Sequence, residues 1–537
     1  MWQALYNWNS EKSEVTRHNI NFYAVYIPTD IYWDVKNHTY SYQLKGFGDF
    51  AERISSFSVN SNVFTSLCDT FINIIKYELK DEDLEKELEI SHSLIKAWKL
   101  NNNTIPQLKY IKEALNERID DVNQLIQRLI FNHKNGDEIP HPDFFDLSFE
   151  SSLELLIPKF QRIYELDDSK KWALCFDELE FAPLWLQKKL FKSLRSRKQY
   201  LLFKLSASPV LSLELEKSLL GEYRATSGND VEMIKMWNAS DKESFSIQII
   251  QSRLKDGVIP REFLGENEIY SKGSGSYVEG SNFYIQLLEL IEKDVSFKNF
   301  LLSKDVNINK PVAKDDGEKN TLFRKIKPIV YHRNAIISKN TGITSQKALG
   351  KRSRKKVIDL YSGIEVFRKV CDGNPRWLIG IINQILVKNK KATVSKRIQY
   401  NELLEAAKKF KNVIDNIPIG DNPKTLTELI ASIAKYQYDQ LLGSKFQMDP
   451  YGTFIVDRSI SAIPNNYVQL IEKGISQGAF ILVDSNNDSF DFEIRGQRIK
   501  LSFLFYILYS LPIRMYNATN LSDCFKGNNN QPTLFNS

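Results

Sequence analysis

In the first half of the chain, short runs of consecutive apolar residues alternate with longer segments of helical pattern. Short apolar runs between polar residues are typical of strands buried on both faces of a parallel sheet, and they occur at residues 20–28, 172–176 and 199–205. Apolar residues at helical spacing occur at residues 63–75, 108–129, 153–164 and 182–195. The alternation predicts an α/β fold in which helices flank a parallel sheet, with a helical insertion over about residues 80–150.

The second half of the chain shows mainly helical spacing, at residues 241–254, 283–291, 424–442 and 465–477. Near its end, the apolar runs 479–483 and 490–494 flank polar turn residues at 485–488, which predicts a hairpin. Helices followed by such a hairpin are typical of a winged-helix-like domain. Domains of this kind bind duplex DNA in some proteins and other proteins elsewhere, so the fold alone does not decide the partner.

These patterns predict three domains. Residues 1–238 are expected to form the α/β core, which a helix over 211–220 and a strand over 228–237 would close. Residues 239–396 would form a helical lid with a loop-rich insertion, and residues 397–537 the winged-helix-like domain. No strand precedes residues 20–28, so we expect the sheet to be incomplete on its N-terminal side.

Composition limits the class of protein without selecting a function. The 72 basic and 66 acidic residues leave a net charge of +6, which permits contact with nucleic acid without requiring it. The four cysteines are far apart and match no zinc-binding spacing. No apolar run approaches the ~18 residues that a membrane span needs. We therefore expect a cytoplasmic protein that makes no membrane contact.

Polar side chains follow two of the predicted strands. Asp177 and Glu178 come directly after the strand at 172–176, and Ser206 and Ser208 follow the strand at 199–205. At the open end of a parallel sheet, one acid can hold Mg²⁺ and a second can activate the water that attacks a phosphate. The alternative is structural, because acidic residues also favour the first turn of a helix.

A Gly-Asn-Pro-Arg turn precedes a predicted helix in the second half of the chain. Asn374 comes before Pro375, and Arg376 falls in the first helical turn. A cation there opposes the helix dipole, which calls for a bound anion or a nearby carboxylate. The two alternatives are contact with a phosphate and a structural salt bridge.

The printed sequence contains no Gly-x-x-x-x-Gly-Lys-Ser/Thr loop, the motif that surrounds the phosphates of a bound nucleotide. Residues 45–51 imitate a dinucleotide-binding loop only weakly, and residues 350–353 lack the upstream glycine and the hydroxyl next to the lysine. A basic cluster at residues 347–356 fits either a solvated loop or a phosphate contact. We expect the phosphate loop to lie just upstream of Met1.

Taken together, the chain resembles bacterial AAA+ ATPases of the origin-recognition-complex-like family. The shared segments, which follow the same order along nearly the whole chain, are Cys175–Glu180, Gly228–Asp230, Tyr361–Gly363, Asp372–Trp377, Gly496–Arg498 and Leu501–Phe503. In this family the acidic strand end is Walker B, the polar-tipped next strand carries sensor 1, and the Asn-Pro-Arg turn carries sensor 2. The resemblance departs at the Walker A segment, which the printed sequence lacks.

The resemblance implies roles for individual residues in the core. Asp177 would hold Mg²⁺, Glu178 would be the catalytic base, and Ser206 or Ser208 would be the sensor 1 residue.

It also implies contacts to ATP from outside the core. Arg376 would be the sensor 2 arginine, beside Asn374. Arg224 would be an arginine finger reaching the nucleotide of a neighbouring subunit in a homo-oligomer, with Arg195 and Arg197 as competing candidates.

Two functions from different classes follow. The first is an ATP-driven switch that moves against a DNA or protein partner, in phage defence or in a mobile element as the kinship implies. It would be an ATP hydrolase if the phosphate loop is supplied upstream or by another chain. The second is a nucleotide-independent adaptor that binds DNA or protein through the winged-helix-like domain and the basic cluster, derived from an ATPase that lost its phosphate loop.

Overall fold

The chain folds as two compact units, Met1–Glu232 and Met233–Ser537, each of which is described by itself. The computed structural model describes residues 20–30, 33, 50–80, 83–132, 141–167, 169–194, 201–210, 215, 230–232, 234–235, 242–255, 257–271, 277–312, 317–337, 357–417, 425–443, 445–483 and 493–525. The expected three-domain division, with a boundary at 396 inside the second unit, stays a prediction.

A three-stranded parallel sheet organises the first unit. Its strands are β1 (Phe22–Pro28), β2 (Lys171–Asp177) and β3 (Leu201–Leu205), in the order β1-β2-β3. Val25 faces Leu174 across the first pair, and Leu174 faces Phe203 across the second. The predicted parallel sheet is therefore confirmed, and the run at 172–176 is its central strand.

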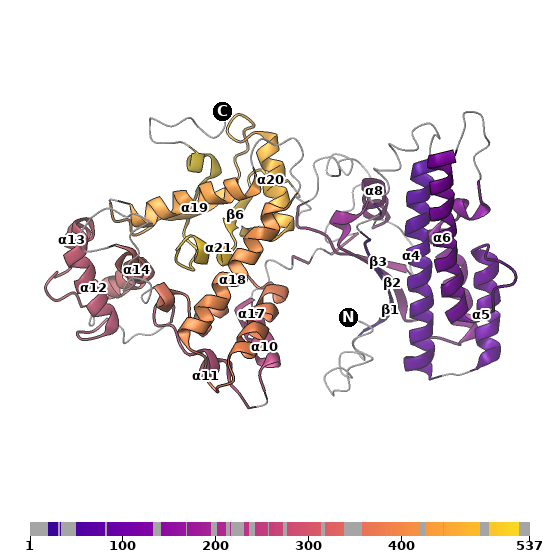
Figure 1. Ribbon diagram of the computed structural model, residues 1–537, viewed down its shortest axis with the longest axis horizontal. Coiled ribbons are helices and arrows are strands. Elements are labelled where there is room, and N and C mark those ends of the chain that lie inside the picture. Colours follow the sequence, from indigo (N-terminus) through magenta and orange to yellow (C-terminus); the bar gives the residue numbers. More distant parts are fainter. Residues whose placement is uncertain are drawn as a thin grey trace. The chain divides into compact units, whose positions relative to one another are not determined.

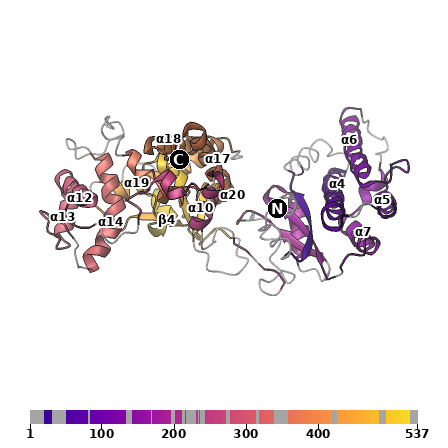
Figure 2. The same cartoon turned by 90° about the horizontal axis from the view of Figure 1, so that it is seen from below.

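Helices cover this sheet and extend away from it. They are α4 (Phe50–Asn73), which continues as the π-helix η2 (Ile74–Leu79), α5 (Leu84–Ala97), α6 (Leu108–Asn132), α7 (Phe149–Ile163) and α8 (Leu184–Ser193). α4 packs against β1, where the Thr70 hydroxyl donates to the Ala24 carbonyl at 3.2 Å. α4 lies between the sheet and α5 in both views (Figures 1 and 2). α5, α6 and α7 thus form a helical layer with α4, and the insertion expected over about residues 80–150 stays a prediction.

The core of this unit centres on Trp172, which is fully buried on β2. The rings of Phe71 and Phe160 stack with centroids 3.8 Å apart, and Trp172 meets both edge-on at 5.7 and 6.1 Å. Such aromatic contacts add about 0.5–1.5 kcal/mol per pair beyond the burial of area. The contact joins the central strand to α4 and α7, the helix that leads into it.

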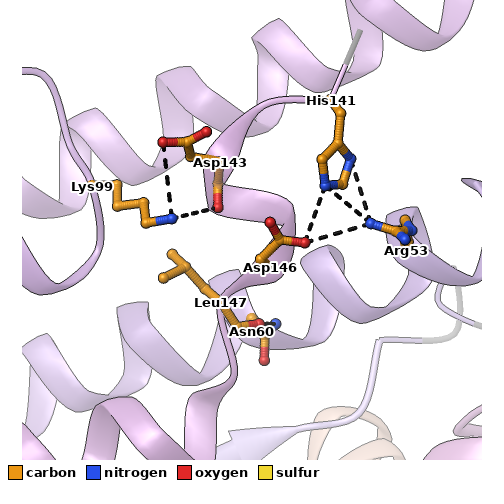
Figure 3. Close-up of polar contacts among 7 residues, drawn as sticks. All are labelled: Arg53, Asn60, Lys99, His141, Asp143, Asp146 and Leu147. Atoms are coloured by element: carbon orange, nitrogen blue, oxygen red, sulfur yellow. Dashed lines mark hydrogen bonds and ion pairs between the residues drawn. The ribbon is translucent and has the colours of Figure 1, made fainter. Parts of the chain in front are cut away.

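The segment before α7 is held by polar contacts to α4 and to the residues that follow α5, and Figure 3 shows several of these contacts. The Asn60 side chain donates to the Leu147 carbonyl at 2.6 Å and accepts from the Phe149 amide at 3.0 Å. Lys99 donates to the Asp143 carbonyl at 3.0 Å. Within this segment, Asp143–Asp146 forms a 3-10 helix, η3. Residues 133–140 lie outside the described residues.

The second unit combines helices with a small sheet. Its helices are α10 (Lys242–Arg253), α11 (Pro260–Leu264), α12 (Asn282–Lys293), α13 (Val295–Leu302), α14 (Gly317–Ile336), α16 (Ile364–Phe367), α17 (Pro375–Lys388), α18 (Lys396–Asp415), α19 (Leu426–Leu442), α20 (Asn465–Ser476) and α21 (Phe503–Leu508). Its strands are β4 (Tyr451–Ile455), β5 (Phe480–Val483), β6 (Arg498–Leu501) and β7 (Asn517–Asn520), in the order β5-β6-β4-β7. α19 and α20 confirm two helices expected from the sequence.

The strand that pairs with β5 lies further along the chain than the sequence predicts. β5 pairs antiparallel with β6, with Phe480 facing Leu501. Residues 493 and 494 are not in a strand, and 484–492 lie outside the described residues. The register follows burial, since Ile499 and Leu501 are both fully buried on β6. Turn residues alone could not show this.

A proline inside α14 ties that helix to the C-terminal segment. Pro328 has no amide hydrogen, so the Arg324 carbonyl four residues earlier loses its helical donor. The Arg514 guanidinium donates to the carbonyls of Arg324 at 3.2 Å and Lys325 at 2.8 Å. A guanidinium 190 residues away in the sequence thus supplies the donor that the Arg324 carbonyl lacks within the helix.

All four cysteines, Cys68, Cys175, Cys371 and Cys524, are free thiols. Among the parts of the chain that the structure describes, no helix combines the length and the hydropathy needed to cross a membrane.

Two glycines in helices of the second unit predict opposite effects of an added methyl group. A Cβ at Gly474 in α20 would stand 2.4 Å from Cδ2 of Phe480, which is 1% exposed. A Cβ at Gly380 in α17 would meet nothing within 4 Å. We expect the unfolding free energy of Gly474→Ala to lie about 1–3 kcal/mol below that of Gly380→Ala, because the first overpacks a core and the second only improves helix propensity. Urea unfolding measures both. Equal values would contradict the packing of α20 on β5.

Candidate functional site

An acidic turn forms where the central strand ends. β2 ends at Asp177, and Glu178 follows in the left-handed region with φ 55° and ψ 44° before the short 3-10 helix η4 (Leu179–Phe181). This conformation costs an ordinary residue about 1–2 kcal/mol. The Glu178 amide donates to Oδ1 of Asp177 at 3.0 Å. The chain therefore turns sharply at the edge of the sheet where the carboxyl ends of parallel strands meet.

β1 supplies hydroxyl groups to the same edge. The Tyr26 hydroxyl donates to Oδ2 of Asp177 at 3.0 Å. Thr29 donates to the Asp177 carbonyl from its hydroxyl at 2.5 Å and from its amide at 3.2 Å. Desolvation, and then the hydrogen bond to Asp177, raise the pKa of Tyr26. Sequence reasoning missed both residues. The sequence feature that could have identified them is a hydroxyl side chain near the end of the strand predicted at residues 20–28.

β3 clamps the acidic turn from the other side. The Ser206 amide donates to the Phe176 carbonyl at 2.9 Å, and the Leu179 amide donates to the Ser206 carbonyl at 3.0 Å. The backbone of Ser206 is thus bonded on both sides of Asp177 and Glu178. The structure therefore brings together the predicted acids and the predicted serines of the next strand.

Glu180 is a further carboxylate of this turn. Its Oε2 accepts the amide of the buried Ser208 at 3.1 Å. Burial raises the pKa of Glu180, and the negative charges of Glu178 and Asp177 add to the effect. Glu180 thus links the turn to the second candidate serine.

The chemistry of the turn suits a hard cation. Each oxygen of Asp177 receives one donor, from Tyr26 or from the Glu178 amide, and each carboxylate oxygen can accept two. Acceptor sites remain for Mg²⁺ or for its bound water. Among the described residues, no group of three acidic, histidine or cysteine side chains forms a metal site. Asp177 could hold a metal only together with ligands from another source, such as phosphate oxygens and water.

The predicted sensor 2 residues lie in the second unit. Asn374 is the N-cap of α17, and its Oδ1 accepts the amides of Arg376 at 3.0 Å and Trp377 at 3.3 Å. Arg376 is exposed in the first turn of α17. The helix start predicted there is confirmed. The Asn374 side-chain oxygen is engaged in capping, which gives this residue a structural role.

Other predicted site residues fall outside the described residues. These are Arg224, Arg195, Arg197, the basic cluster at 347–356 and the turn at 485–488. Of the strand expected at 228–237, only an isolated bridge at Val231 occurs among the described residues.

Comparison with known proteins gives one finding. A family model described as ORC-CDC6-like matches residues 1–521 of the chain. No curated protein and no solved structure gives a significant match.

The raised pKa of Glu180 predicts a pH-dependent stability difference. The folded protein binds this proton more tightly than the unfolded chain, so the resulting stability is present below the ordinary Glu pKa and is lost as pH rises through the folded pKa. We expect Glu180→Gln, which carries no charge at any pH, to raise the urea midpoint at neutral pH. The difference from the unsubstituted protein should shrink on acidification. Glu113→Gln, on the exposed face of α6, is the control. A gap that does not change with pH would contradict the assignment.

Proposed function

The chain belongs to the ORC-CDC6-like family, and on this premise we propose that it is an ATP-driven molecular switch that acts on duplex DNA. Membership in this family indicates AAA+ ATPase-type function. The proposal goes further by assigning roles to residues of this chain and by naming the partner.

One observation carries the nucleotide part of the proposal. The central strand ends in Asp177 and Glu178, and the turn that holds these acids is bonded to both neighbouring strands. A turn in the left-handed region, fixed by contacts from both neighbouring strands, is the kind of strain that persists where a site needs defined geometry. A core strand followed by an ordinary helix start would not require it.

The roles follow from the positions in the turn. Asp177, with lone pairs left after its two hydrogen bonds, would hold Mg²⁺ or its water. Glu178 would take the proton of the attacking water. Ser206 or Ser208 would orient that water from β3, and Ser206 has the closer backbone link to the acids.

Bound Mg-ATP would supply the phosphoryl group and the metal charge that stabilises its transfer. The carboxylate of Asp177 fits the Mg²⁺ ion of Mg-ATP. The printed sequence contains no recognisable phosphate loop, so binding of the β and γ phosphates depends on further residues. Arg376, exposed in the first turn of α17, is proposed to contact phosphate as the sensor 2 arginine that the resemblance implies.

The C-terminal region supplies the DNA part of the proposal. α19, β4 and α20 are followed by the antiparallel strands β5 and β6, and β6 pairs with β4. A helix, a strand, a second helix and a hairpin in this pairing support a winged-helix domain with α20 as its recognition helix. Arg495 donates to the Ile463 carbonyl and to Asn465 at 2.8 Å each, which fixes the start of α20.

The exposed face of α20 suits a DNA groove. Gln469 and Lys473 are exposed and lie four residues apart on one face. Gln can pair with adenine in the major groove, and Lys can neutralise a phosphate.

A nucleotide-independent adaptor remains the second candidate. The specific observation in its favour is the absence of a phosphate loop from the printed sequence. It differs from the switch in that DNA binding would not respond to ATP.

Glu178→Gln separates chemistry from binding. We expect the variant to bind Mg-ATP in a calorimetric titration while its turnover falls by about 10²–10⁴, the usual contribution of a general base. Glu113→Gln, on α6, is the matched control and should leave turnover unchanged. A chain extended upstream in frame should be titrated in parallel, because ATP binding by the extended form alone would place the phosphate loop in the added residues. If neither form binds ATP while DNA binding persists, the adaptor replaces the switch.

Lys473→Ala tests the DNA contact. We expect weaker binding to duplexes of any sequence and a slope of log affinity against log salt reduced by about 1, because one phosphate contact is lost. Lys435→Ala is the control, as Lys435 is exposed on α19 and pairs with Asp439. If both variants lower the affinity equally, or if neither lowers it, α20 is not the groove-binding helix.

A further inference from the structure

Two buried charges connect the turn before Arg376 with the C-terminal sheet. Nζ of Lys500 contacts Oδ1 of Asp372, and the two side chains are only 6% and 7% exposed. Lys500 lies on β6, which pairs with both β5 and β4. Asp372 lies in the turn between α16 and α17. The pair thus joins segments far apart in the sequence inside the second unit.

The other oxygen of Asp372 binds the same C-terminal segment. Oδ2 accepts the Ser502 hydroxyl at 3.0 Å and the Phe503 amide at 2.8 Å. The Ser502 oxygen also caps α21 by accepting the Leu504 amide at 3.4 Å. Lys500 Nζ lies 3.5 Å from the centroid of the Phe503 ring. Both carboxylate oxygens are therefore engaged by residues of β6 and the start of α21.

The backbone carries this restraint to Arg376. Asp372 has φ 52° and Gly373 has φ 83°, so two consecutive residues adopt the left-handed region. Aspartate, like asparagine, adopts this region more readily than most other residues, and here its carboxylate is also held by Lys500, Ser502 and Phe503. The Asn374 amide then donates to the Cys371 carbonyl at 2.8 Å. Asn374 also caps α17, the helix whose first turn contains Arg376. Every residue from Asp372 to Arg376 is held by the turn, the cap or the helix.

We propose that Asp372 is a positioning residue for Arg376. Its carboxylate attaches the turn that precedes Arg376 to the C-terminal sheet, so that the turn and the sheet move as one body. A partner that shifts the sheet would then also shift Arg376. This functional consequence rests on the proposed contact of Arg376 with nucleotide phosphate, whereas the link itself rests on the contacts described.

The competing interpretation is that the pair only stabilises the unit. A matched control exists, because Asp294 is equally enclosed. It pairs with Arg333, the two side chains are 6% and 2% exposed, and its Oδ1 accepts the Phe297 amide at the start of α13. Both aspartates therefore bind a buried cation and a helix N-terminus, and only Asp372 adjoins the Arg376 turn.

Hydrogen exchange of the whole chain distinguishes the two interpretations. We expect Asp372→Asn to accelerate exchange of the amides of residues 376–378 by about tenfold beyond its effect on global unfolding, a change equivalent to ~1.4 kcal/mol. Asparagine tolerates the left-handed region, so the backbone conformation itself is retained. In Asp294→Asn, exchange of the same amides should accelerate only as much as the loss of global stability predicts. Equal behaviour of these amides in both variants overturns the proposal.

A second pair of variants perturbs the fold less than the aspartate substitutions and keeps the test valid if those variants fail to fold. Ser502→Ala removes one hydrogen bond to Asp372 together with a helix cap, and Ser281→Ala removes the cap of α12 without touching this turn. Faster exchange at 376–378 only in Ser502→Ala supports the link, and its absence overturns it. Where the protein binds Mg-ATP, Ser502→Ala should also raise the dissociation constant relative to Ser281→Ala. If neither the unsubstituted protein nor its upstream-extended form binds ATP, the proposed function fails while the exchange comparison still decides the link.

Discussion

The first unit depends on the packing of Trp172 against the stacked rings of Phe71 and Phe160. This contact sets β2 against α4 and α7, and it does so although the indole N–H of Trp172 has no acceptor among the described residues. An unsatisfied buried donor costs about 1–3 kcal/mol, so apolar and aromatic packing must outweigh it. With β2 fixed between β1 and β3, its last residue must lie at the sheet edge that its neighbours share.

That edge explains how ordinary backbone bonds build a candidate site. Ser206 bonds to Phe176 and Leu179, and Thr29 bonds to Asp177. These contacts hold Glu178 in a conformation that would be unfavourable alone. The carboxylates are thus positioned by the sheet and not by flexible loops, which is the condition for a site with defined geometry.

The second unit uses buried charges in a similar way. Asp372 with Lys500 and Asp294 with Arg333 each tie a helix start to a distant segment. Buried ion pairs contribute little net stability compared with apolar replacements, because desolvation offsets their attraction. Removing one partner, however, lowers the stability of the fold, because the other charge stays buried without compensation. Arrangements that separate the two charges are therefore disfavoured. Burial also lowers the pKa of Lys500, and the charge of Asp372 opposes that effect.

The sequence by itself determined the local features: three apolar runs that became the parallel sheet, the helix spacing, the Asn-Pro helix start at Asn374, and the acids that end the central strand. These depend on neighbours along the chain, so local pattern suffices. It failed where partners are distant. The sequence predicts the second strand of the hairpin at residues 490–494, whereas the strand that pairs with β5 is 498–501, where Ile499 and Leu501 are buried, and residues 493 and 494 are not in a strand. Only the tertiary structure decided that Tyr26 contacts Asp177 and that Asp372 contacts Lys500, because a carboxylate gains its partner from whichever strand the fold brings beside it, and no sequence spacing encodes that.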